Sequence, residues 1–224
     1  MSADVNGMFD RIAPTYDALN RVLSLGIDQS WRRRAVLALG ELRGRAVLDL
    51  CAGTLDLSRL AQARGAEVVA SDFAQHMLER GRTKLKMSIP LVRADAQRLP
   101  FADGAFFGAL CGFGLRNLDD PLAGLREMRR VLAPGGRLVV LDFFRPRRAL
   151  TRAVQVIYNR KVLPLVGGLI SGDASAYRYL ARSIERFATR EEAETLARQA
   201  GFDNVRGIDL TVGVAALLIA EVKS

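Results

Sequence analysis

The spacing of apolar positions first changes its period near residue 45. Before that point, apolar residues between 8 and 40 recur at intervals of three and four, the spacing of one helix face. Asp28 stands where it can cap a second helix through Trp31 to Leu39, and Gly40 stands where such a helix ends. We therefore expect two helices in this region.

Short apolar runs then alternate with helical patterns as far as residue 143. Pro121 suits the first turn of a helix, and Ala133-Pro134-Gly135-Gly136 is typical of a turn. This alternation favours a doubly wound, mostly parallel sheet with right-handed crossovers. The expected strands are 46–50, 67–71, 91–94, 107–111 and 137–143, and the expected helices are 55–64, 74–84 and 121–132.

This alternation of strand and helix patterns ends after residue 146. Residues 147–185 have the pattern of two helical segments joined around Pro164 and Gly167, and Thr189 caps a further helix that ends at Gly201. Two last strands, 205–210 and 214–222, are close enough to pair antiparallel at the sheet edge. We expect a single domain (1–224) with a seven-stranded sheet. Its parts are a helical cap (1–42), a core (43–146), a helical insertion or lid (147–188) and a C-terminal helix with a strand pair (189–224).

Composition agrees with one α/β domain. Of the 224 residues, 50% are hydrophobic and 25% are charged. The first ten residues carry two aspartates and no long apolar run, and no apolar run in the chain reaches the roughly 18 residues that a transmembrane helix needs. Cys51 and Cys111 have no metal-ligand spacing, so no metal site is expected. A reduced, cytoplasmic protein is the simplest interpretation.

The net charge of +9 is unevenly distributed. Basic residues without any acidic one occupy 143–172, interleaved with apolar side chains. Such a stretch suits transient contact of 147–170 with an anionic membrane surface, although a solvated basic helix face would show the same pattern. Nucleic acid is not an expected partner, because no recognition motif and no aromatic stacking platform is present.

The main chemical signal lies in Val47-Leu48-Asp49-Leu50-Cys51-Ala52-Gly53-Thr54-Leu55-Asp56. An apolar run ends there in a glycine-containing turn, and Asp72 follows 19 positions after Gly53 at the end of a second apolar run. A turn that lets the backbone approach a ligand, followed by a carboxylate that can bind two ribose hydroxyls, is the arrangement of a nucleotide-binding βαβ unit. The alternative for Asp72 is a local cap of the next helix.

Several further segments together resemble the ubiquinone/menaquinone C-methyltransferase family (UbiE/MenG type), over nearly the whole chain. They include Met8-Phe9-Asp10-Arg11-Ile12-Ala13, Trp31-Arg32, Phe113-Gly114-Leu115-Arg116-Asn117 and Tyr177-Arg178-Tyr179-Leu180. One position departs from the family, whose loop reads Gly-Thr-Gly-Asp where this chain has Leu55. Leucine in a left-handed conformation costs roughly 1–2 kcal/mol, so either Leu55 stays right-handed or the loop is remodelled.

The resemblance implies a Rossmann-like class I fold that uses S-adenosyl-L-methionine to methylate a ring carbon of a prenylated quinol. It implies that the Ala52-Gly53-Thr54 turn holds the amino-acid head of the cofactor, that Asp49 and Asp56 neutralise its ammonium, and that Asp72 binds its ribose. Phe73, Asp95 and Ala96 are the expected adenine contacts. For Asp95 a purely local hydrogen bond, and for Phe73 a place in the core, are the alternatives.

The same resemblance assigns the chemistry of the acceptor to the segment after the fourth strand. Arg116 is expected to lower the pKa of a substrate hydroxyl, and Asn117 to fix a water molecule or ring oxygen. An ion pair from Arg116 to Asp119 or Asp120 is the alternative. Tyr16, Tyr177 and Tyr179 are expected to line the acceptor site, unless they only pack a helix.

Three functions remain open at this point. The first is methylation of demethylmenaquinol, with or without the ubiquinone precursor. The second is methylation of another phenolic or polyketide molecule. The third is a non-catalytic family member in a lipid-quinone complex, which the departure at Leu55 keeps in view. The expected location is the cytoplasm, with peripheral contact at the inner face of the membrane, and a homo-oligomer is compatible with the sequence.

Overall fold

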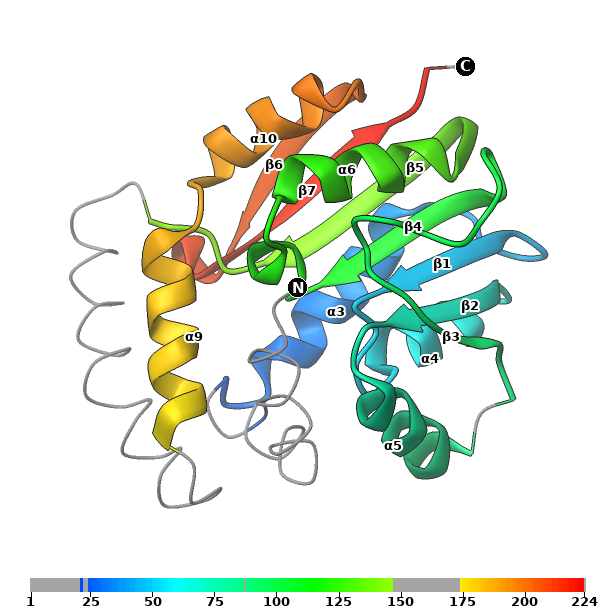
Figure 1. The fold of residues 1–224 in the computed structure, drawn as a ribbon, viewed down its shortest axis with the longest axis horizontal. Coiled ribbons are helices and arrows are strands. Elements are labelled where there is room, and N and C mark those ends of the chain that lie inside the picture. The colour runs from blue at the N-terminus through cyan, green and yellow to red at the C-terminus, as the bar shows by residue number, and fades with distance from the viewer. Residues whose placement is uncertain (1–20, 22–23, 87, 147–173, 224) are drawn as a thin grey trace.

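One sheet forms the centre of the molecule (Figure 1). The computed structural model describes residues 21, 24–86, 88–146 and 174–223, with the side chains of 174–178 left out. The strand order is β3-β2-β1-β4-β5-β7-β6. The strands are β1 (Ala46–Leu50), β2 (Glu67–Asp72), β3 (Leu91–Arg93), β4 (Phe106–Gly112), β5 (Leu132–Asp142), β6 (Asp203–Leu210) and β7 (Ala215–Glu221).

Helices cover both faces of the sheet. Helices α3, α4 and α5 pack on one face, with Trp31 and Leu57 in its core, while α6 and α10 pack on the other, with Leu125 and Ala197. Helix α9 lies beside the ends of the central strands (Figure 1). The helices are α3 (Ile27–Ala38), α4 (Asp56–Gln62), α5 (Gln75–Leu85), α6 (Pro121–Arg130), α9 (Ala174–Arg186) and α10 (Arg190–Gln199), with short 3-10 turns η1 (Leu115–Asn117) and η3 (Thr211–Gly213).

The order of the strands reverses between β1 and β4. Strands β3, β2, β1, β4 and β5 run parallel, and β7 is antiparallel to both β5 and β6. In open sheets of this kind, ligands bind beyond the carboxyl ends of the strands at such a reversal. The topology therefore directs attention to the loops that follow β1 and β4.

Most expected elements are confirmed, including the mixed seven-stranded sheet and the antiparallel C-terminal pair. Two expectations are wrong. The N-cap of α3 is Gly26 in a left-handed conformation, and Asp28 lies in the first turn, where it accepts hydrogen bonds from Ser24 and Arg32. The expected turn at 133–136 lies inside β5, where the register with β4 shifts.

Other expectations fall outside the described residues. They are the first expected helix, Tyr16, and most of the expected lid at 147–188, of which only its end, α9, is described. None of the helices in the described part combines the length and hydropathy needed to cross a bilayer.

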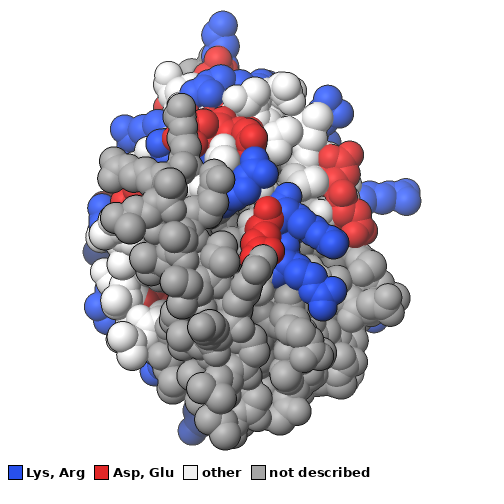
Figure 2. All heavy atoms as spheres, turned by 90° about the vertical axis from the view of Figure 1, so that its left-hand side faces the viewer, with Lys and Arg blue, Asp and Glu red and all other residues white. Residues whose placement is uncertain are grey.

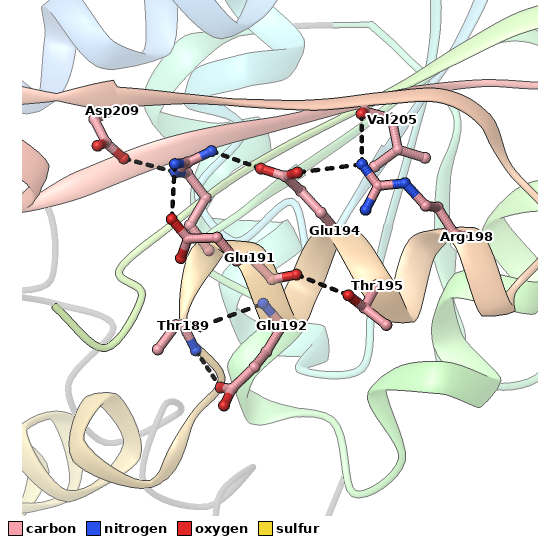
Figure 3. Close-up of polar contacts among 9 residues, drawn as sticks. Thr189, Glu191, Glu192, Glu194, Thr195, Arg198, Val205 and Asp209 are labelled. Carbon is pink, nitrogen blue, oxygen red and sulfur yellow. Dashed lines mark hydrogen bonds and ion pairs between the residues drawn. The ribbon is translucent and has the colours of Figure 1, made fainter. Parts of the chain in front are cut away.

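A polar network fastens α10 to the edge strand β6 (Figure 3). Thr189 and Glu192 form a reciprocal capping box at the start of the helix. The Arg190 guanidinium pairs with Glu194 at 2.6 Å and with Asp209 of β6 at 2.9 Å. Gly207 makes this possible, because a Cβ there would lie 2.6 Å from the Arg190 side chain.

Replacing the cap, Thr189→Ala, is expected to lower the free energy of unfolding by about 1 kcal/mol, because the Glu192 N–H loses its acceptor. Thr195→Ala on the same helix is the control. Its hydroxyl donates to the Glu191 carbonyl, which already belongs to the helix, and alanine has the higher helix propensity, so this replacement should not destabilise the protein and should stabilise it by up to about 0.7 kcal/mol. Urea unfolding of both variants measures the difference, and equal effects would contradict the capping role.

Candidate active site

A cavity lies at the carboxyl ends of β1, β2 and β4, where the strand order reverses. It is formed by the loop after each of these strands together with the first turns of α5 and η1. Three residues expected at a cofactor site, Gly53, Asp72 and Phe73, line it, and so does Asn117. The other lining residues are Cys51, Ala74, Met77, Gly112, Phe113, Gly114 and Leu118.

The Asp72 carboxylate joins two of these loops. Its Oδ2 accepts a hydrogen bond from the Gly53 N–H at 2.8 Å, and its Oδ1 accepts one from the Ala74 N–H at 2.8 Å. The expected alternative, a local cap after the strand, is therefore present in part. Each carboxylate oxygen has a second acceptor position, so the same group can also accept hydrogen bonds from a pair of hydroxyls at the cavity. The two tethers fix the orientation in which it would do so.

The loop after β1 is built from alternating left-handed residues. Cys51, Gly53 and Leu55 have φ angles of 52°, 52° and 66°. Leu55 thus takes the conformation for which glycine is suited, and the alternative of a right-handed Leu55 is wrong.

Burial explains why leucine is tolerated at position 55. The side chain is fully buried against Ala70 and Leu78, in space left by Gly81, whose added Cβ would lie 2.6 Å from the Leu55 Cγ. Burying a leucine contributes roughly 1.5–3 kcal/mol, which offsets the roughly 1–2 kcal/mol cost of the left-handed conformation. The left-handed conformation at this position is therefore stabilised without a glycine.

Asp49 lies behind this loop, on β1, and is fully buried. Its Oδ2 accepts a hydrogen bond from the Ser58 hydroxyl of α4 at 2.6 Å, while its Oδ1 has no hydrogen-bond partner among the described residues. Burial raises the pKa of this carboxyl to about 7, and the negative charge of Asp72 adds to the effect. An unpartnered buried carboxylate oxygen suits a site that a cationic group completes.

Asp56, the second acidic residue of the loop, has other partners. It lies in the first turn of α4, where Oδ1 pairs with the Lys84 ammonium at 3.1 Å and Oδ2 lies 3.7 Å from Arg32 Nε. It is not one of the residues lining the cavity. The structure thus uses Asp56 to join α3, α4 and α5, and its expected contact with a ligand stays a prediction.

The expected adenine contacts are only partly brought together. Phe73 lines the cavity, and the Arg93 guanidinium lies 5.7 Å from its ring centroid. Asp95 accepts hydrogen bonds from Gln97 in a local turn, which lower the pKa of its carboxyl against the opposing effect of burial. Ala96 is buried in the core on the α6 face. Neither Asp95 nor Ala96 lines the cavity.

Arg116 forms a buried ion pair that the sequence did not predict. Its Nη1 donates to the Asp142 carboxylate at the end of β5 and to the Phe113 carbonyl, 2.7 Å away. The ion-pair partner is therefore Asp142 and not Asp119 or Asp120, the two partners expected as the alternative. Arg116 is not one of the residues lining the cavity, but its Nε is buried and has no hydrogen-bond partner among the described residues. The guanidinium is thus held through its Nη1, while the buried Nε–H has no partner among these residues.

Asn117 and Tyr179 meet although they lie 62 positions apart. The Tyr179 hydroxyl donates to Asn117 Oδ1 at 3.1 Å, and Asn117 Nδ2 donates to the Phe113 carbonyl at 3.1 Å. Burial raises the pKa of Tyr179, which keeps its hydroxyl protonated as a donor. Two residues expected at the acceptor side are therefore neighbours, while the side chain of Tyr177 and all of Tyr16 lie outside the described residues.

Sequence reasoning missed Phe113 as a residue of the cavity wall. Phe113 has a φ angle of 59°, its ring lies 4.9 Å from the Phe143 ring, and its carbonyl accepts from both Arg116 and Asn117. Its place between Gly112 and Gly114 was the available signal. Gly114 allows the loop after β4 to approach the loop after β1, because a Cβ there would lie 2.3 Å from Cys51.

Replacing the buried carboxyl, Asp49→Asn, is expected to stabilise the protein more at high pH than at low pH. The folded state keeps this proton up to about pH 7, whereas an ordinary aspartate loses it near 3.8, so the wild type loses stability as the pH rises through this interval. The amide cannot ionise and still accepts from Ser58. Urea unfolding at a series of pH values should show a gain that grows up to neutrality and then levels off. A gain that shrinks with rising pH would contradict this.

Comparison with known proteins finds similar sequences along almost the whole chain. The model of the ubiE/COQ5 methyltransferase family matches residues 1–222. A demethylmenaquinone methyltransferase of Thermus thermophilus is 47% identical over 219 residues, which cover 96% of this chain and 99% of that protein. A ubiquinone/menaquinone biosynthesis C-methyltransferase UbiE of Geotalea uraniireducens is 40% identical over 225 residues, with coverages of 97% and 95%.

Solved structures support the fold. A SAM-dependent methyltransferase of Thermotoga maritima has a TM-score of 0.70 at 21% identity, over 97% of this chain and 99% of that one. The cyclase SpnF has a TM-score of 0.70 at 17% identity, over 98% and 95%. Because proteins of different activity share this fold, the reaction must be argued from the site.

Proposed function

Because the chain belongs to the ubiE/COQ5 methyltransferase family, it is an enzyme of methyl transfer, and we propose that it uses S-adenosyl-L-methionine to methylate a ring carbon of a prenylated quinol. The first-choice acceptor is demethylmenaquinol, after the Thermus thermophilus relative, and a ubiquinone precursor is the second. The observation that carries the proposal is the Asp72 carboxylate, oriented at the cavity by the Gly53 and Ala74 N–H groups.

The residues of the cavity fit the parts of this cofactor. The second acceptor positions of Asp72 suit the two ribose hydroxyls, and Phe73 beside them offers a flat apolar surface to the adenine. Asp49 does not itself line the cavity, but it lies on β1 just before the Ala52-Gly53-Thr54 turn, and its unpartnered Oδ1 suits the ammonium group. Asp56, Asp95 and Ala96 would enter only through a local rearrangement of their present contacts. When bound, the cofactor supplies a methyl group on a sulfonium centre. In-line attack on that methyl group releases a neutral thioether, which is a good leaving group.

The protein must make the ring carbon nucleophilic. A quinol hydroxyl that loses its proton pushes electron density into the ring, and a cation beside it favours that loss. Arg116 is the proposed cation. A guanidinium stays protonated in proteins and cannot serve as the base, and the Nε without a partner is a donor that a phenolate oxygen could engage.

Asn117 and Tyr179 would orient the acceptor. Asn117 lines the cavity, and its side chain is fixed at both ends by the Phe113 carbonyl and the Tyr179 hydroxyl. Alignment of the ring carbon with the methyl group contributes several kcal/mol to catalysis in well-oriented reactions. Tyr16 and Tyr177 are proposed to complete the same wall.

A quinol with an isoprenoid tail comes from a membrane. We propose that 147–170, the basic and apolar stretch, contacts an anionic membrane surface at its cytoplasmic side. Figure 2 shows the face on which α9 lies, where a group of described basic side chains lies near the middle, beside acidic ones. A homo-oligomer is compatible with this arrangement. The division into a cap, core, lid and C-terminal unit stays a proposal.

Asp72→Asn is expected to weaken binding of S-adenosyl-L-methionine by about 100-fold, because charge-assisted hydrogen bonds to the ribose are lost. Isothermal titration calorimetry measures the change. Asp203→Asn, an exposed carboxylate at the start of β6, is the matched control and should bind as the wild type does. Retained affinity in Asp72→Asn would contradict the proposed cofactor site. A methyl-transfer assay of the wild type on demethylmenaquinol and on simple phenols then decides between the quinol and the second reading, another phenolic or polyketide acceptor.

Arg116→Gln should destabilise the fold by about 3–5 kcal/mol, because Asp142 would remain charged and buried without its partner. The double variant Arg116→Gln/Asp142→Asn removes both charges and should recover stability. If the guanidinium acts on the acceptor, methyl transfer stays low in the double variant although it folds. Recovery of both stability and turnover would leave Arg116 a structural role only.

A further inference from the structure

One buried side chain of α3 contacts both the start of α4 and the loop after β4. Arg32 of α3 is 7% exposed. Its Nε lies 3.3 Å from Asp28 Oδ2 on the same helix and 3.7 Å from Asp56 Oδ2 in the first turn of α4. The guanidinium carbon also lies 5.2 Å from the centroid of the Phe113 ring, in the loop after β4. A single side chain therefore touches the elements that follow β1 and β4.

The guanidinium lies directly behind the wall of the cavity. An added Cβ at Gly112 would be 3.9 Å from Arg32 Nη1 and 2.6 Å from Leu57 Cδ1. Gly112 and Phe113 both line the cavity from the other side. Arg32 is thus one layer away from the ligand space and does not touch it.

Phe113 is held between cationic and aromatic neighbours. Its ring packs against Phe143, whose ring in turn has the Arg116 guanidinium at 5.6 Å. Arg32 and Arg116 therefore lie at the two ends of a pair of rings. The carbonyl of Phe113 accepts from Arg116 and Asn117, so the placement of this residue bears on the acceptor side as well.

The charge of Arg32 matters for its carboxylate neighbours. Asp28 and Asp56 lie next to its guanidinium, and Lys84 also pairs with Asp56. The charge of Arg32 also acts on the buried Asp49 carboxyl. The positive charge of Arg32 and the Ser58 hydrogen bonds favour the ionised form of Asp49, whereas burial and the charge of Asp72 oppose it.

We propose that Arg32 of α3 is a positioning residue of the cofactor site, which holds the start of α4 and Phe113 in place and supplies the buried positive charge near Asp49. The inference rests on the proposed function in so far as the ligand is S-adenosyl-L-methionine. It goes beyond that function in giving α3, which contributes no residue to the cavity wall, a role in binding. The proposed effect is on cofactor affinity and on its pH dependence.

Three variants test this in the full-length protein: Arg32→Gln, Arg32→Lys and, as the matched control, Arg33→Gln. Arg33 is exposed on the same helix and its replacement changes the net charge equally. Calorimetry with S-adenosylhomocysteine, which keeps the ammonium group, gives the affinity at a series of pH values. Carboxyl-carbon NMR of the ligand-free protein, assigned with Asp49→Asn, follows the titration of Asp49 independently of any ligand.

The expected result is a shift of both profiles to higher pH in Arg32→Gln. Without the cation Asp49 ionises at higher pH, so affinity near neutrality should fall by about tenfold or more and partly return as the pH is raised. Arg32→Lys, which keeps the charge but not the planar stacking, should show a smaller shift in the same direction. Removing one partner of a buried ion pair is costly. If Arg32→Gln does not fold, the shift in Arg32→Lys alone therefore tests the proposal.

Two results would overturn the proposal: the Asp49 titration of both Arg32 variants coinciding with that of Arg33→Gln, or a lower affinity with an unchanged pH profile, as expected of general destabilisation. Failure of the proposed function looks different. The wild type would then not bind S-adenosylhomocysteine at all, while the NMR titration of the ligand-free protein would still report on Arg32.

Discussion

The double hydrogen bond to Asp72 is the contact on which the site depends. Its carboxylate oxygens accept from Gly53 and from Ala74, which belong to the loops after two adjacent strands. Parallel strands bring these loops to the same edge of the sheet, and a side chain at the end of β2 joins them directly. The carboxylate is thereby held in one orientation at the cavity, and a binding group that is already oriented loses less entropy when a ligand arrives.

The rest of the site repeats this principle. Each loop is held from behind by a buried charge: Arg116 and Asp142 hold the loop after β4, and Arg32 with Asp56 joins α3 to the start of α4. Buried ion pairs contribute little to net stability, because desolvation cancels most of their attraction. Their value here is geometric, since the arginine of each pair contacts Phe113. A leucine in place of the family's glycine at position 55 is accommodated because its side chain fills space beside α5.

Much of the fold could be predicted from the sequence, because the alternation of short apolar runs with helical patterns is local information. The errors lie where the same stretch of sequence is compatible with two local structures. Asp28 is a good capping residue, but the left-handed Gly26 begins the helix, and the Pro134-Gly135 turn signal is absorbed as an irregularity within β5. The site was predictable as far as Gly53, Asp72, Phe73 and Asn117, whose positions follow from strand ends. The Asp142 partner of Arg116 and the contact of Asn117 with Tyr179 could not be found, because they join residues that are distant in the sequence.

The most direct measurement is a crystal structure of the protein with S-adenosylhomocysteine. The account predicts both ribose hydroxyls within hydrogen-bond distance of the Asp72 carboxylate, with the Gly53 and Ala74 contacts kept, and the sulfur facing Asn117. A nucleoside bound elsewhere, or an Asp72 side chain that turns away from the ribose, would contradict it.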